Sequence, residues 1–266
     1  MRRGACAKLD GMAGRPREAP GWYVISLRPR GEHAGLRAAA ARAGAGLIAL
    51  SPWRLVDRTD AATLAALDAA LAAPCVVVTS PTAVRAAAVM RPLRDVQTRW
   101  CAVGTGTAAA LRRAGVRAVD VPGRMDSEGV LALSALQDVA GCTVGLLTAP
   151  GGRDAIAPAL AARGAQVQRA DVYAREVLAP APSAVAALER IDAPCALALS
   201  SGEALRQVLA ALPPAAVREL RCAQAVAASD RLTALARTLG FRDVVRAAGP
   251  RPGQLVSAAT VARAPR

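Results

Sequence analysis

The chain has almost none of the side chains on which most cofactor and metal sites depend. Its 266 residues include one histidine, His33, and one lysine, Lys8. Because Lys8 lies close to the N-terminus, a P-loop lysine or a Schiff-base lysine in the body of the protein is excluded. One histidine leaves few of the usual zinc sites open, and a catalytic triad would have to use it. We therefore expect no metal, and we interpret His33 as a polar residue early in a helix.

Aromatic residues and long apolar runs are also scarce. Aromatics make up 2% of the chain and apolar residues 53%, many of them alanine, which suits a layered α/β core of Leu, Val and Ala. No uninterrupted apolar stretch approaches the roughly 18 residues of a membrane span. Residues 1–20 lack the apolar segment of a secretory signal. We therefore expect a cytoplasmic protein without membrane contact and a disordered extension over residues 1–21.

The six cysteines form no C-x-x-C pair, and five stand at or near the start of an apolar run. This pattern predicts small buried residues in a reducing compartment rather than disulfides or metal ligands. The cysteines are Cys6, Cys75, Cys101, Cys142, Cys195 and Cys222.

The formal net charge is +14, and both ends of the chain contribute to it. An anionic partner is one explanation, and solvated surface charge in an arginine-rich chain is the other. Nucleic acid is not expected, because the arginines are scattered and few aromatic side chains exist to stack bases.

Apolar runs of strand length alternate with helix-length amphipathic segments along the whole chain. This alternation predicts parallel βαβ units. Ten expected strands would make two five-stranded sheets. They cover residues 22–27, 46–51, 75–80, 100–104, 117–121, 143–149, 165–173, 195–201, 222–229 and 242–248.

Two kinds of strand–turn–helix unit recur in the order first, second, first, second. Residues 24–50 resemble residues 144–170, and the segments 76–87 and 101–121 resemble 197–209 and 223–245. Duplication is the simple explanation for such self-similarity.

The turn "AVGTGTAAAL" fits the dinucleotide spacing G-x-G-x-x-A through Gly104, Gly106 and Ala109. However, several other expected strands end in similar turns rich in small or hydroxyl residues, such as "TSPTAV", "TAPGGRD", "SSGEAL" and "AASDRL". Such turns line the crevice at the carboxyl ends of parallel strands, where helix N-termini bind anions. Two sets of them suit a ligand with several carboxylates better than one dinucleotide.

Seven motifs in this order resemble the uroporphyrinogen-III synthase family over roughly residues 22–250. They are "ISLRP", "VTSPTAV", "AVGTGTAAAL", "DSEG", "TAPGGRD", "DVYAR" and "LALSSGEAL". The resemblance implies two parallel-sheet α/β domains joined by two extended linker strands, "SPWRLVD" and "VYAREVL". Domain 1 would hold residues 22–52 and 176–250, domain 2 residues 57–172, and residues 251–266 would be a flexible tail.

The family's reaction closes hydroxymethylbilane, a linear tetrapyrrole carrying acetates and propionates, with inversion of the last ring and loss of water. The resemblance thus implies a cofactor-independent enzyme of tetrapyrrole (haem) biosynthesis, acting as a monomer on a small-molecule substrate. Transient contact with the preceding enzyme of the pathway is a further expectation.

The resemblance also implies the site. Tyr173 matches the family's cleft tyrosine and is the expected donor or orienter for the leaving hydroxyl, although an aromatic wedge at the hinge is the alternative. The expected substrate-binding residues lie mostly at strand-to-helix turns, where N-capping hydroxyls and solvated arginines are the alternatives. They are Arg28, Ser80, Thr107, Ser127, Gly151, Gly152, Arg153, Ser200 and Ser229.

One turn departs from the family pattern. Ala227 and Ala228 stand where relatives commonly carry glycine and threonine, so contacts from that turn are expected to be rearranged. Two other functions stay open on the sequence alone. One is a two-domain binding protein for a small anionic ligand, and the other is a nucleotide-dependent oxidoreductase or glycosyltransferase.

Overall fold

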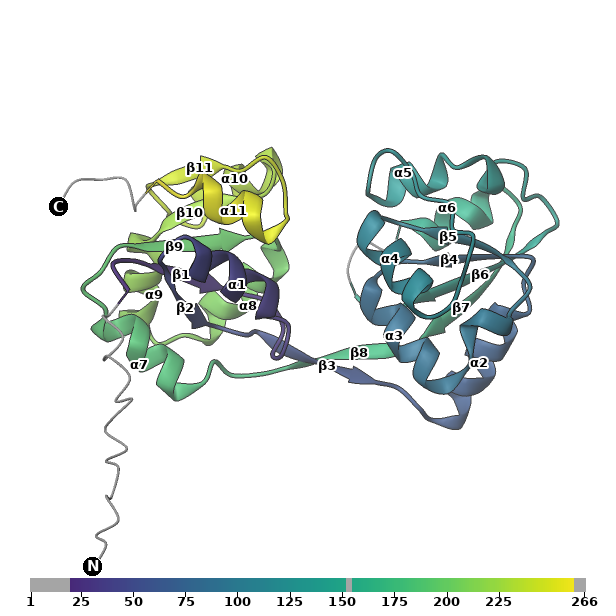
Figure 1. The fold of residues 1–266 in the computed structure, drawn as a ribbon, viewed down its shortest axis with the longest axis horizontal. Helices are drawn as coiled ribbons and strands as arrows, with labels where there is room; N and C mark the ends of the chain where they lie inside the picture. The colour runs from purple at the N-terminus through teal and green to yellow at the C-terminus, as the bar shows by residue number, and fades with distance from the viewer. Residues whose placement is uncertain (1–19, 152–154, 261–266) are drawn as a thin grey trace, which may run out of the picture. The chain divides into compact units, whose positions relative to one another are not determined.

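The computed structural model describes residues 20–151 and 155–260 (Figure 1). It divides the chain into two compact units, each with a parallel sheet of its own. Unit 1 combines Met1–Pro52 with Ala179–Arg266, and unit 2 is the continuous segment Trp53–Leu178. The predicted α/β class with two parallel-sheet domains is confirmed.

Unit 1 contains a five-stranded parallel sheet in the order β11-β10-β9-β1-β2. In its strand β1, Ile25 is fully buried and pairs with Ile48 on one side and Leu197 on the other. A strand covered on both faces requires a continuous apolar run, which explains the composition of these segments. The strands are β1 (Tyr23–Ser26), β2 (Gly46–Ala49), β9 (Cys195–Leu199), β10 (Gln224–Ala227) and β11 (Val244–Arg246). The helices are α1 (Ala34–Arg42), α7 (Pro182–Arg190), α8 (Gly202–Ala211), α9 (Pro214–Cys222), α10 (Asp230–Thr238) and α11 (Pro252–Ala258).

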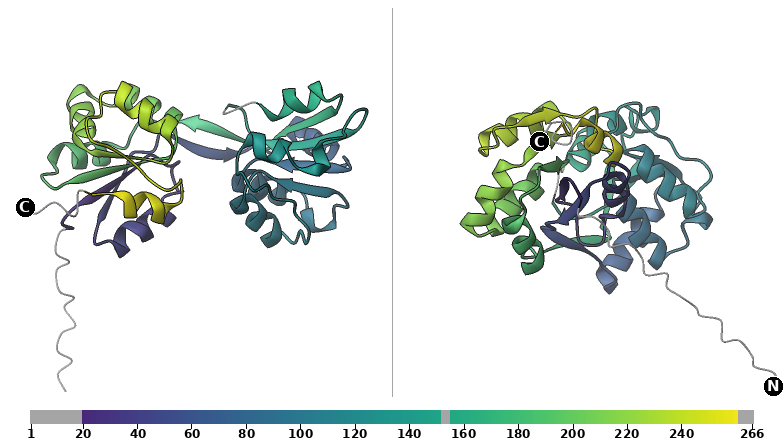
Figure 2. Two further views of the ribbon diagram at one scale, coloured as in Figure 1. Left: turned by 90° about the horizontal axis from the view of Figure 1, so that it is seen from above. Right: turned by 60° about the vertical axis from the view of Figure 1, so that its left-hand side comes forward.

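The expected flexible tail over residues 251–266 is wrong for residues 252–258, which form α11. Leu255 is 1% exposed and packs in one cluster with Val24 and Ala196 of the sheet. Proline at the first turn is compatible with a helix, and the backbone N–H of Arg251 donates to the Gln254 side chain. Tertiary packing therefore stabilises a helix too short to be recognised from periodicity. It lies beside α1 (Figures 1 and 2).

Unit 2 contains a four-stranded parallel sheet in the order β5-β4-β6-β7 and a separate antiparallel pair, β3 with β8. The strands are β3 (Trp53–Asp57), β4 (Cys75–Val78), β5 (Arg99–Ala102), β6 (Thr143–Thr148), β7 (Gln166–Asp171) and β8 (Tyr173–Val177). The helices are α2 (Ala61–Leu71), α3 (Pro81–Met90), α4 (Thr105–Arg113), α5 (Ser127–Leu131) and α6 (Ile156–Ala162), with 3-10 turns at Leu93–Asp95 and Ser134–Leu136.

The prediction of a fifth strand in the second sheet, over residues 117–121, is wrong. Pairing there is limited to one bridge, in which Asp120 donates its N–H to the Trp100 carbonyl and accepts from the Ala102 N–H. Pro122 follows directly and has no N–H to continue a ladder. The sheet of unit 2 therefore has four strands among the described residues.

The expected strand over residues 165–173 is in fact two elements. It separates at Val172 into β7, which belongs to the parallel sheet, and β8, which pairs antiparallel with β3. In that pair Leu55 lies opposite Arg175, and Asp57 lies opposite Tyr173. Figure 2 shows the two strands side by side. β3 and β8 are the first and last elements of unit 2.

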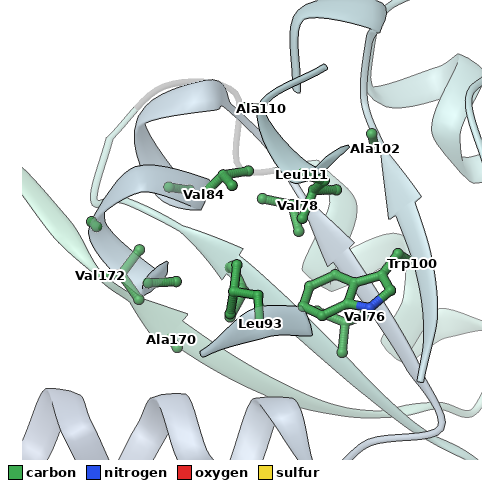
Figure 3. Close-up of a cluster of buried hydrophobic side chains, with 14 of the residues drawn as sticks. Val76, Val78, Val84, Leu93, Trp100, Ala102, Ala110, Leu111, Ala170 and Val172 are labelled. Carbon is green, nitrogen blue, oxygen red and sulfur yellow. The ribbon is translucent and has the colours of Figure 1, made fainter. Parts of the chain in front are cut away.

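The core of unit 2 fixes the end of β4. Val76 and Val78 are fully buried and pack with Leu93, Trp100 and Leu111 (Figure 3). Thr79 and Ser80 follow this buried strand, so their backbone positions are set by the packing beneath them. Across the described ranges, no helix has the length and hydropathy of a membrane-spanning segment.

Candidate functional site

Ser80 connects strand β4 to helix α3. Its backbone is extended (φ −155°), and its Oγ accepts a hydrogen bond of 3.1 Å from the Ala83 N–H, while Pro81 occupies the first helical position. Such an N-cap satisfies one unpaired helix N–H and contributes about 1 kcal/mol. A serine hydroxyl that accepts at the cap still has a hydrogen to donate elsewhere. Ser80 is therefore an N-cap with capacity for a second hydrogen bond.

The second partner of Ser80 is Tyr173, the first residue of β8. The two hydroxyl oxygens are 3.2 Å apart. The tyrosine is 6% exposed, and its ring belongs to the core cluster that contains Val84 and Val172. Since the ring is held by packing and the phenol oxygen by Ser80, the position of the Tyr173 hydroxyl is fixed before any ligand binds.

Both residues line a pocket of about 210 Å³ in unit 2, formed where β4, β6 and β8 end or begin. The lining is mostly small, hydroxyl-bearing or apolar. It consists of Thr79, Ser80, Val103, Ser127, Thr148, Ala149, Gly151, Ile156, Tyr173 and Arg175. The structure thus brings together Ser80, Ser127, Gly151 and Tyr173 of the residues that the sequence predicts.

Two threonines of this lining were not predicted. Thr79 Oγ1 donates to Thr148 Oγ1 at 3.0 Å and lies 3.3 Å from the Leu147 carbonyl oxygen. Thr79 follows β4, "CVVV", and Thr148 is the last residue of β6, "TVGLLT". These two buried strands are neighbours, so both threonines lie where the strands end. That signal was present in the sequence, because parallel neighbours end side by side.

Arg175 is the one charged residue among the described residues of the pocket lining, and it too was not predicted. It lies two residues beyond Tyr173 on the same strand, so both side chains leave the same face. Its guanidinium carbon lies 5.2 Å from the centre of the Trp53 ring, within cation–π range. The sequence contained a signal for this residue, because the motif "DVYAR" includes Arg175 as well as Tyr173, but the motif was interpreted only through its tyrosine.

Gly151 has φ +78°, a backbone conformation that side chains other than glycine's rarely adopt. A Cβ built there would lie 4.0 Å from Arg175 Nη1. Glycine is therefore required here by the backbone rather than by a lack of space. Gly152 and Arg153, also predicted to bind substrate, lie outside the described residues.

A family model described as "Uroporphyrinogen-III synthase HemD" matches residues 35–257, most of both units. The chain belongs to the uroporphyrinogen-III synthase family. The resemblance stated from the seven motifs is thereby confirmed.

Curated members of the family share 35% identity with parts of the chain. The uroporphyrinogen-III synthase of Salmonella typhimurium matches over 155 residues, 56% of this chain and 61% of that protein. That of Escherichia coli matches over 149 residues, 54% of this chain and 60% of that protein. The matched stretch thus spans less than two thirds of either relative.

Solved structures of the family share the fold at low identity. A mutant uroporphyrinogen III synthase from the extremely thermophilic bacterium Thermus thermophilus superposes with a TM-score of 0.60 at 18% identity, over 91% of this chain and 98% of that one. The enzyme from Helicobacter pylori gives 0.56 at 11% identity, over 88% and 96%. At this identity the likeness establishes the fold alone.

Four of the other family-derived residues, which the structure does describe, do not line this pocket: Arg28, Thr107, Ser200 and Ser229. Thr107 is buried in α4 at 4% exposure. Arg28, Ser200 and Ser229 belong to unit 1. Ser229 caps α10 by accepting from the Leu232 N–H, as the N-cap alternative holds. Their role in substrate binding stays a prediction.

Two of these unit 1 residues have distinct surroundings. Ser200 is exposed, and the cap of α8 is its neighbour Ser201, which accepts from the Ala204 N–H at 3.2 Å. Burial lowers the pKa of Arg28, and the nearby Glu32 carboxylate works in the opposite direction. Burial therefore disfavours the charged form of Arg28, and an anionic ligand nearby would offset this desolvation.

His33 is more constrained than an ordinary polar residue at a helix start. It is 8% exposed, its Nδ1 lies 2.8 Å from Ser26 Oγ, and its Nε2 lies 2.8 Å from Ser51 Oγ. Its position directly before α1 agrees with the prediction, but it makes no side-chain cap bond. Burial, followed by the charges of Arg37 and Arg28, lowers its pKa, and Glu32 opposes this.

The cysteines differ from one another in exposure. Cys75 and Cys101 are buried with their sulfurs 3.7 Å apart, whereas Cys142 and Cys222 are exposed and Cys195 is half-buried. The prediction of burial is thus wrong for Cys142 and Cys222, which precede their strands instead of lying in them. Within residues 20–151 and 155–260, no three metal-ligating side chains cluster.

Proposed function

We propose that this chain is a uroporphyrinogen-III synthase, which closes hydroxymethylbilane to uroporphyrinogen III with inversion of the last pyrrole ring and loss of water. The observation that carries the proposal is the Tyr173 hydroxyl, held 3.2 Å from Ser80 Oγ in a hydroxyl-lined pocket of a chain that belongs to this family. The fixed phenol is a proton donor placed where a substrate hydroxyl can meet it.

In the proposed mechanism Tyr173 donates its proton to the terminal hydroxyl of the bilane, which leaves as water. The substituted carbon of the last ring attacks the methylene carbon of the protonated azafulvene so formed, which gives a spiro intermediate. The bond from that carbon to its original bridging methylene then breaks and re-forms at the free α-carbon of the same ring. The proton lost from that carbon returns to the phenolate, so that Tyr173 is regenerated. The substrate supplies most of the reactivity, and the protein supplies orientation and one proton donor.

The remaining lining suits the acetate and propionate groups of the bilane. Hydroxyls and backbone N–H groups bind carboxylates through charge-assisted hydrogen bonds. Ser127 and Gly151 present such groups in the pocket of unit 2. We include Arg28, Thr107, Gly152, Arg153, Ser200 and Ser229 as contacts for other parts of the substrate.

The cellular setting belongs to the same proposal. We propose a cytoplasmic monomer that takes up hydroxymethylbilane by transient contact with the enzyme that makes it. The reason is chemical, because free hydroxymethylbilane closes spontaneously to the type I isomer. Rapid transfer would limit that loss.

A coupled assay tests the function. Hydroxymethylbilane is generated with its own synthase, this protein is added, and the oxidised uroporphyrin isomers are separated by chromatography. The expected result is a change from type I, formed without the protein, to type III. Persistence of type I in the presence of folded protein would contradict the proposal and favour a binding protein instead.

A further inference from the structure

The pocket of unit 2 contains a cation that lies over an aromatic ring. Arg175 contributes to the lining together with Ser80, Ser127 and Tyr173, and its guanidinium lies over Trp53 at 5.2 Å. A guanidinium carries its N–H groups in a fork that matches the two oxygens of a carboxylate. Arg175 is therefore the group of this lining that suits bidentate binding of a substrate carboxylate.

The position of Arg175 beside Tyr173 limits which carboxylate this is. The two side chains leave the same face of β8 and line the same pocket, whose volume is about 210 Å³. One pyrrole ring of the bilane bears both the hydroxymethyl group and carboxylate side chains, so a single ring can reach both residues. An anion bound at Arg175 would thus belong to the ring whose hydroxyl faces Tyr173.

We propose that Arg175, which lies over Trp53, binds a side-chain carboxylate of the pyrrole ring that carries the leaving hydroxyl, and so positions that hydroxyl at Tyr173. The inference rests on the proposed function and adds to it a residue that selects substrate by charge. Arg175 is a positioning residue and takes no part in proton transfer.

Substitution of Arg175 with a matched control tests the inference. Arg175→Met removes the charge and keeps the length, whereas Arg175→Lys keeps a point charge without the fork. Arg54→Met is the control, because Arg54 lies on the paired strand β3, is exposed, and bonds Glu176 outside the pocket. Thermal unfolding confirms that each variant is folded.

We expect Arg175→Met to raise KM by about tenfold or more, the effect of one charge-assisted hydrogen bond. Arg175→Lys should recover part of this loss, and Arg54→Met should stay within about twofold of the wild type. Trp53→Leu should also raise KM, as Arg175→Lys does, because it removes the ring over which the Arg175 guanidinium lies. Unchanged KM in folded Arg175→Met would overturn the inference.

Binding of uroporphyrin III, an octacarboxylate, separates this inference from the proposed function. Quenching of its fluorescence gives the affinity without any turnover. Weaker binding to Arg175→Met than to Arg54→Met supports the carboxylate site even where the wild type fails to make the type III isomer. Equal binding by the two variants, or no binding by the wild type, overturns it.

Discussion

His33 is the residue whose surroundings differ most from what its sequence position suggests. A neutral imidazole donates from one ring nitrogen and accepts at the other, and each nitrogen here has a serine hydroxyl at 2.8 Å. A second proton on the ring would place a buried charge close to Arg28 and Arg37, with Glu32 alone in opposition. The folded protein therefore holds His33 neutral, and the cost of charging it belongs to the folded state.

This cost makes stability depend on pH. The unfolded chain protonates His33 near its ordinary pKa of about 6.5, whereas the folded protein has a lowered pKa. Between the folded and unfolded pKa values the unfolded state binds more protons. The free energy of unfolding is therefore highest above about pH 6.5, falls as the pH is lowered through that value, and stops falling below the folded-state pKa. Urea unfolding at pH 7.5 and 5.5 should show this loss in the wild type and less of it in His33→Gln. An equal loss in both would exclude His33 as its source.

Tyr173→Phe removes the proton donor and leaves the ring in the core. We expect kcat to fall by about tenfold, below the usual range for a general acid, because water can also protonate the leaving hydroxyl. KM should change little. The Tm should stay close to that of the wild type, since Ser80 keeps its capping bond to the Ala83 N–H. A wild-type kcat in Tyr173→Phe would rule out proton donation by the phenol.

At the scale of helices and strands, two glycines differ in the space around them. One lies at a close contact between a strand and a helix, and the other belongs to the turn that resembles a dinucleotide-binding motif. A Cβ on Gly145 in β6 would lie 2.2 Å from the Ala70 carbonyl oxygen of α2, a backbone atom that cannot give way. A Cβ on Gly106 in α4 would lie 3.7 Å from Pro81 Cγ, an ordinary contact. Only the first glycine is required by the approach of two elements.

We therefore expect opposite effects from two alanine substitutions. Gly145→Ala should lower the free energy of unfolding by about 3 kcal/mol through overpacking. Gly106→Ala should raise it by roughly 0.5–1 kcal/mol, because alanine is the better helix former. Chemical denaturation of the two variants checks both signs. A destabilised Gly106→Ala would mean that the turn needs this glycine for another reason.

The success of sequence-based prediction follows element length and burial. Strand β4, "CVVV", is buried at every position and was predicted. Residues 117–121, "RAVDV", also contain valines but pair only through Asp120. Helix α11 was missed because its stability comes from Leu255 packing on the sheet. Arg175 was missed because "DVYAR" was interpreted only through its tyrosine, although Arg175 lies on the same face of the strand two residues later. Composition reports burial, but not which strand finds a partner.

At the scale of the whole molecule, unit 2 is an uninterrupted segment of chain, whereas unit 1 needs two segments. In unit 1, β1 from the first segment pairs with β9 from the second. In unit 2 the first and last strands pair with each other, Trp53 opposite Val177. The sequence repeat indicated two similar halves, but which half interrupts the other depends on these pairings.

Unit 2 should accordingly fold by itself. We expect a fragment of residues 53–178 to unfold cooperatively, because its sheet and core come from within the segment. The same fragment with Gly145→Ala is the matched control for specific packing. Circular dichroism with urea unfolding is the measurement, and a non-cooperative transition in the fragment would contradict the expectation. The fragment should not form the type III isomer.

The rate at which each cysteine thiol reacts with a reagent reports how its unit opens. Exposed Cys142 and Cys222 should react at once with a thiol reagent, whereas buried Cys75 and Cys101 should wait until the β4–β5 edge of unit 2 opens. Cys195 reports on unit 1, and burial raises its pKa to about 11, so few of its thiols are ionised near neutral pH. Mass spectrometry of timed samples would then give the order in which the two units unfold.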